Sequence, residues 1–167
     1  TGVDLWVLPL LPLSGERTPW PFLNTTADEN NAVFSPDVHW IAYDSNESGT
    51  PQIYVRPFPG APGQSPCQVS FTATGSVQPM WRGDELFFLA PDGMMMSASI
   101  STAKGCVADK PEALFPTGVV FTANRHLYAV SENGKRFLFI VPAPSSSPIT
   151  VGVNWLWRPL LLQLGVI

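Results

Sequence analysis

The sequence is poor in charge and contains no cluster of basic residues. Only 13% of its 167 residues are charged, and 9 lysines and arginines against 13 aspartates and glutamates give a net charge of −4. Nucleic-acid binding requires basic groups that displace counterions from phosphates, so no nucleic-acid partner is expected. Because 45% of the residues are apolar, the chain is not typical of a disordered protein, and its length predicts one packed domain.

Long periodic segments are also missing. No stretch longer than about ten residues has a convincing helical period, and 18 prolines and 13 glycines interrupt the chain. We therefore expect many short elements joined by turns, which favours an all-β class. The apolar C-terminal segment is interrupted by Arg158, Pro159 and Gln163. It falls short of the roughly 20 residues that span a bilayer, so we expect it to pack against protein and the chain not to span a membrane.

Cysteine and histidine are scarce, with two residues of each. Cys67 and Cys106 lack the CxxC spacing and the nearby histidine of a zinc site, so no metal is predicted there. They could form one disulfide, but two separate buried thiols are the favoured interpretation. His39 and His126 are not accompanied by the Gly-x-Ser-x-Gly turn of a Ser-His-Asp hydrolase, so both are interpreted as structural.

What the sequence does contain is a repeating unit of turn, strand, hairpin loop and strand. The clearest copy, residues 34–57, begins with Ser-Pro-Asp, continues with the run HWIAY and ends with QIYVR. Similar runs follow, QPMW with LFFL and then YAV with FLF, and Asp-Gly at 92–93 and Asn-Gly at 133–134 predict tight hairpins. Phe34 and Trp81 occupy corresponding positions, which gives a period of about 47 residues.

A period of this length, with about four short strands in each copy, is typical of a β-propeller. Blades stacked around an axis cover the apolar faces that each blade leaves open, so inner strands are continuous apolar runs. We therefore predict an all-β fold, a partial β-propeller of about three to four four-stranded antiparallel blades. The expected single module, 1–167, contains a blade remnant at 1–12, blades at about 18–58, 65–100 and 110–142, a closing strand at 148–156 and an apolar tail at 157–167.

Four segments carry a family likeness: FSPDVHWIAY with IYVRPFPG, QPMWRGDELFFLAPDG, YAVSENGKRFLF and ITVGVNW. Their order resembles the TolB-like, WD-related propeller repeats, and most closely the C-terminal propeller of bacterial eukaryotic-like serine/threonine kinases. The likeness covers about residues 4–155. It departs from the pattern at Val38, where the family has glycine in the turn, in the short segment 81–86, and beyond residue 155.

The resemblance implies a non-catalytic interaction or sensing module, the C-terminal part of a larger protein, with no catalytic, cofactor-binding or metal-binding residues and no cofactor. Kinase motifs are absent from this sequence. A protein or small-molecule ligand is left open, and two such halves could complete a ring as a homodimer. The alternatives are an accessory propeller of a prolyl-peptidase-type hydrolase whose catalytic domain is absent here, and a solitary periplasmic scaffold. The expected location is extracytoplasmic, either periplasmic or at the cell surface.

Several short motifs suggest binding but have plainer interpretations. Residues 44–49, DSNESG, resemble the start of an EF-hand loop, yet Val55 stands where the twelfth-position glutamate is required, so a hairpin loop is favoured. Arg82-Gly83-Asp84 spells an adhesion tripeptide but falls in a predicted blade turn. Asn24 and Asn46 begin glycosylation sequons, which matter only in a glycosylating host.

Sulfur and aromatic side chains form the last group of candidates. Met94, Met95 and Met96 could line an adaptable binding surface, but packing in the core or at a sheet edge is favoured. Tryptophans near the central channel could contact a ligand, although their repeat positions favour the blade core. These candidates are Trp20, Trp40 and Trp81.

Overall fold

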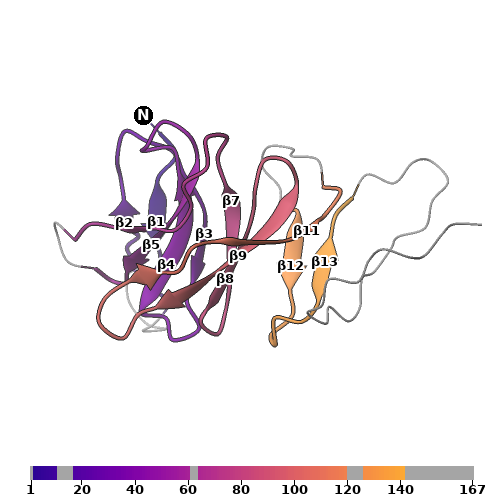
Figure 1. Ribbon diagram of the computed structural model, residues 1–167. Helices are drawn as coiled ribbons and strands as arrows, with labels where there is room; N and C mark the ends of the chain where they lie inside the picture. Colours follow the sequence, from indigo (N-terminus) through magenta and orange to yellow (C-terminus); the bar gives the residue numbers. More distant parts are fainter. Residues whose placement is uncertain (1, 11–16, 61–63, 120–125, 142–167) are drawn as a thin grey trace, which may run out of the picture.

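The computed structural model describes residues 2–10, 17–60, 64–119 and 126–141, which form strands and turns without any helix (Figure 1). The strands are β1 (Leu5–Val7), β2 (Trp20–Leu23), β3 (Glu29–Phe34), β4 (Trp40–Ser45), β5 (Gln52–Pro57), β6 (Cys67–Gln68), β7 (Val77–Arg82), β8 (Glu85–Leu89), β9 (Met94–Ser101), β10 (Val107–Ala108), β11 (Glu112–Pro116), β12 (Tyr128–Val130) and β13 (Phe137–Phe139). Within these ranges no helix could cross a membrane. The predicted all-β class is confirmed.

Two antiparallel sheets, one of four strands and one of five, form the centre of the described structure; each contains a run of four consecutive strands, here called a four-stranded blade. One has the strand order β3-β4-β5-β6 and the other β7-β8-β9-β10, and β11 pairs with the first half of β9. Strands that are neighbours in the chain are neighbours in the sheet, because short turns join antiparallel strands directly. The Asp-Gly hairpin lies between β8 and β9, where Gly93 has a φ of 78° and its N–H donates to the Ala90 carbonyl.

The first strands of the two sheets repeat the same irregularity. Pairing of β3 with β4 shifts register between Asn30 and Val33, and pairing of β7 with β8 shifts between Val77 and Met80. Each bulge contains a left-handed residue, Asn31 with a φ of 51° or Gln78 with a φ of 58°. The bulge therefore recurs in these two sheets, at the period that the sequence predicts.

Alternate side chains of one strand enter two different cores. In β8, Leu86 and Phe88 pack in a cluster with β4 and β5 side chains such as Ala42 and Val55. Phe87 and Leu89 point the other way, into a cluster with β12 and β13. Both faces of β8 are thus covered, which explains why LFFL is a continuous apolar run rather than an alternating one.

The same arrangement holds one sheet earlier. Ile41 and Tyr43 of β4 pack with Leu23 of β2, on the face opposite to Ala42. The sheets therefore stack in chain order, with β1–β2 at one end of the described residues and β12–β13 at the other (Figure 1). Four-stranded antiparallel sheets that stack in this way are propeller blades, and the described structure is a partial β-propeller.

The boundaries between the sheets fall at later residues than the blade boundaries predicted from the sequence. β6 pairs with β5 and completes the sheet that begins at Glu29, although the sequence division placed it with the following unit. β2 pairs with β1, not with the strands after it. A strand as short as β6 has no measurable alternation, so its partner cannot be read from the pattern. The expected closing strand at 148–156 and the apolar tail at 157–167 lie outside the described residues.

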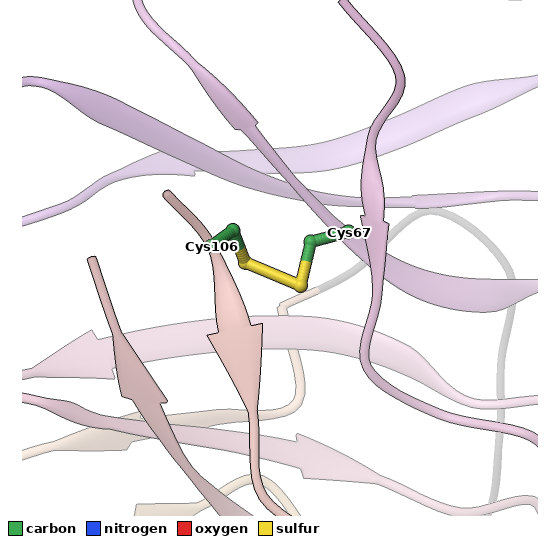
Figure 2. The surroundings of a disulfide bond; sticks show 2 residues. All are labelled: Cys67 and Cys106. Atoms are coloured by element: carbon green, nitrogen blue, oxygen red, sulfur yellow. A yellow bond between two sulfur atoms is a disulfide. The ribbon is translucent and has the colours of Figure 1, made fainter. Parts of the chain in front are cut away.

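Cys67 and Cys106 form a disulfide, so the favoured interpretation of two separate thiols is wrong (Figure 2). Their Cα atoms are 5.8 Å apart, within the usual range for such a bond. Cys67 begins β6, the outer strand of one blade, and Cys106 directly precedes β10, the outer strand of the next. The disulfide therefore links two neighbouring blades at their outer edges.

Candidate binding pocket between the blades

A cavity of about 140 Å³ opens between the two four-stranded blades, where the β3–β4 turn meets the β7–β8 turn. The end of β9 closes its third side. The cavity brings together two tryptophans, two aspartates, one residue of β9 and one residue just after it: Trp40, Trp81, Asp37, Asp84, Ile100 and Thr102. Both aspartates occupy the same position of the repeat, so the period that builds the blades also places two carboxylates at one site.

Side-chain hydrogen bonds hold the β3–β4 turn in place. The Ser35 hydroxyl donates to Asp37 Oδ1, and that oxygen also accepts the His39 N–H at 3.1 Å. The Trp40 N–H donates to Ser35 Oγ at 3.0 Å. The Ser35 hydroxyl, followed by the His39 amide, lowers the pKa of the Asp37 carboxyl, so it is ionised at neutral pH.

Val38 closes this turn where the resembled family has glycine. Its N–H donates to the Ser35 carbonyl at 2.9 Å, and its φ is 61°. A left-handed conformation is strongly disfavoured for a β-branched residue. The turn therefore keeps its geometry without glycine and carries local backbone strain.

The same pattern, a serine hydroxyl bonded to the side chain two residues later, recurs in the β12–β13 turn. There the Ser131 hydroxyl donates to Asn133 Oδ1 at 2.8 Å and accepts the Arg136 N–H at 3.0 Å. In the turn between these two, Arg82 replaces the serine. Its guanidinium donates from Nε and Nη2 to the Val130 carbonyl and from Nε to that of Ser131. The arginine of the adhesion tripeptide thus fixes one blade to the next.

The two carboxylates of the cavity differ in their surroundings. Asp37 Oδ2 lies 3.4 Å from His39 Nδ1, and both side chains are largely exposed. Asp84 is exposed, and its carbonyl accepts the Ile100 N–H at 2.7 Å, which ties the turn to the end of β9. Among the described residues, no hydrogen bond or ion pair to the Asp84 carboxylate is found. That carboxylate is consequently available to a ligand.

The sequence-predicted tryptophans separate into two groups. Trp40, half-buried, and Trp81, buried, both line the cavity. Trp20 instead stacks on Phe58, with ring centroids 6.0 Å apart, beside Phe22. The repeat position therefore predicted the packing of Trp81 correctly but gave no sign that it also borders a cavity.

The EF-hand-like segment serves the contact between blades. Asp44 is buried, and its Oδ1 accepts the Asn31 side-chain amide at 2.8 Å and the Gln78 N–H at 3.0 Å. Desolvation raises the pKa of the Asp44 carboxyl, opposed by these donors and by His126. Val55 is fully buried in the core. Across the described ranges, no group of three metal-ligating side chains is gathered.

Two sequons and the methionine run complete the candidates. Asn24 is exposed, whereas the half-buried Asn46 donates its amide to Asp28 at 3.1 Å. Met95 is fully buried and packs with β12 and β13, and Met96 packs on the core between the four-stranded blades. The preferred interpretation as packing residues is confirmed for Met95 and Met96.

Sequence reasoning missed Gln78, which connects three blades. Its N–H donates to Asp44, and its Oε1 accepts the Leu127 N–H at 3.0 Å. Its carbonyl accepts the buried Tyr128 hydroxyl at 2.7 Å, which also reaches the Phe87 carbonyl at 3.0 Å. Its position one period after Asn31 is the only signal in the sequence, because neither residue type by itself indicates a contact between blades.

Comparison with known proteins identifies no family. No protein-family model matches the sequence, and no curated protein matches it. Among solved structures, one assigned as TolB from Agrobacterium tumefaciens is similar, with a TM-score of 0.44 and 20% identity over 59% of this chain. The chain spans 37% of the length of that structure. At this level the similarity carries no functional conclusion, and the blade assignment depends on strand pairing and packing.

Proposed function

We propose that this chain is the C-terminal part of a larger propeller protein and acts as an interaction or sensing module. The observation that carries the proposal is the pair of small sheets at the two ends of the blade stack. Among the described residues, β1–β2 and β12–β13 each supply two strands, whereas the sheets between them have four and five. Such ends are completed by further strands of the same protein or by another chain.

Exposed apolar side chains accompany both ends. Trp6 in β1 is 57% exposed, with Val3 and Leu8 beside it in the chain, and Leu138 in β13 is 58% exposed, followed by Ile140. Apolar surface gathered in this way favours association. A second copy related by a two-fold axis could cover both ends at once and complete a ring, as a homodimer.

The disulfide supports an extracytoplasmic location. Disulfides persist in oxidising compartments and are rare in the cytosol, where thiols are kept reduced. With Cys67 and Cys106 joined, the described residues contain no free cysteine. We therefore propose that the module lies in the periplasm or at the cell surface.

The proposal is tested by the solution mass of the chain and of end-face variants. Light scattering coupled to size exclusion should give about twice the 18.2 kDa of one chain. Trp6→Ser and Leu138→Ser should return the mass to one chain. Phe71→Ser is the matched control, because Phe71 is 74% exposed but belongs to the segment that joins β6 to β7, not to either end sheet. A monomer at every concentration would refute ring completion by a second copy.

A further inference from the structure

We propose that the cavity between the β3–β4 and β7–β8 turns binds an alkylammonium group, carried by a free amine or by a lysine side chain of a partner protein. The inference deepens the proposed function, because it assigns that interaction module a site and a ligand chemistry. It rests on the residue types that line the cavity and on how the two blades hold them.

The lining combines the two features that bind an organic cation. Trp40, half-buried, and Trp81, buried, both border the cavity, and a cation over a tryptophan ring is attracted by the ring quadrupole. Asp37 and Asp84 add two carboxylates, of which Asp84 has no partner among the described residues. An anionic ligand would meet repulsion from both. An uncharged apolar ligand would leave the carboxylates without a counter-charge.

Two cationic residues beside the lining leave negative charge uncompensated. The Arg82 guanidinium donates to the carbonyls of Trp81, Val130 and Ser131. His39 lies beside Asp37, so it offsets at most one of the two negative charges. The cavity, at about 140 Å³, is smaller than the pockets that hold drug-sized ligands, and it suits a small head group.

The site is held by three connections between its walls. The Ile100 N–H donates to the Asp84 carbonyl, which fixes the end of β9 to the β7–β8 turn. Trp81 and Ile100 belong to the core shared by the two blades. Beyond Thr102 the chain reaches Cys106, whose disulfide joins it to Cys67 of the other blade. A site that is ordered before binding loses less free energy to immobilisation.

The test is a fluorescence titration of the whole chain with two probes, tetramethylammonium chloride and Nα-acetyl-lysine methylamide. Sodium chloride at equal ionic strength and tert-butanol serve as the salt and the neutral-shape controls. We expect saturable changes in tryptophan emission with at least one of the two cationic probes and with neither control. Asp84→Asn should weaken binding about tenfold, as expected for the loss of a close charge pair.

Glu132→Gln is the matched variant, since Glu132 is exposed in the corresponding turn of β12–β13 but does not line the cavity. It should bind as the wild type does. Trp40→Leu is a second binding variant, and thermal melts check that each variant folds. Saturation by the lysine derivative alone would point to a protein partner, and saturation by tetramethylammonium as well would extend the site to small free alkylammonium ions.

The inference would be overturned by the absence of a saturable change with either cation, or by equal binding by wild type and Asp84→Asn. Binding of tert-butanol as strong as that of the amines would also overturn it, because the carboxylates would then play no part. The solution mass tests the end faces independently of any amine. Failure of the amine site therefore leaves the association test unaffected, and failure of association leaves the titration unaffected.

Discussion

The Cys67–Cys106 disulfide is expected to contribute a large share of the stability of this chain. The two cysteines are 39 residues apart in the sequence. For a closed loop of about 40 residues, the chain-entropy relation gives about 13 cal/mol/K, or about 4 kcal/mol at 25 °C. Single domains have unfolding free energies of about 5–15 kcal/mol, so opening the bond should remove a substantial fraction of the total.

Urea unfolding measures this directly. The wild type should lose about 3–5 kcal/mol in reductant, and Cys67→Ala with Cys106→Ala should show the same loss without reductant. Reductant should have no effect on the double variant, and this control shows whether the reductant acts on stability in any way other than by opening the disulfide. A loss below about 1 kcal/mol would refute the reasoning, because the loop would then be closed already in the unfolded chain.

Three further perturbations test other contacts. Glu29 is buried with Oε2 unpartnered, and desolvation raises the pKa of its carboxyl, opposed by the hydrogen bond from the Thr25 hydroxyl. The folded state therefore binds more protons, and stability falls as pH rises through the folded pKa. Glu29→Gln should melt at a higher temperature at pH 7 and show a flatter pH profile. Arg82→Ala should lower the unfolding free energy by about 1.5–3 kcal/mol in urea, since it leaves the Val130 carbonyl without its charged donor. Val38→Gly should raise it by about 0.5–1 kcal/mol, because relief of the left-handed strain exceeds the extra entropy of the unfolded glycine. A lower melting temperature for Glu29→Gln, an unchanged Arg82→Ala or a destabilised Val38→Gly would contradict the respective contact.

The inner strands and their order could be predicted because their chemistry is local. HWIAY and LFFL are short continuous apolar runs, which is the pattern of a strand that is buried on both faces. These runs form most of β4 and β8, and the two faces of each strand pack in different cores. The Asp-Gly signal at 92–93 placed the β8–β9 hairpin for the same reason, because Gly93 adopts the positive φ that the turn needs.

The contacts between blades could not be predicted in this way. β6 has two residues, so its partner depends on the sheet beside it. Cys67 and Cys106 meet because successive outer strands are neighbours in space, a fact that spacing in the sequence does not contain. The cavity likewise arises only when turns one period apart lie side by side, so Asp37 and Asp84 looked like unrelated turn residues until the blades were stacked.

The central claim is that the two central sheets are neighbouring blades of one propeller body, and amide hydrogen exchange of the native chain tests it most directly. The amides of β4 and β8 should be the slowest to exchange, with similar opening free energies, because the core between the sheets couples their unfolding. Fast exchange throughout one sheet while the other stays protected would contradict the claim, since the sheets would then unfold independently.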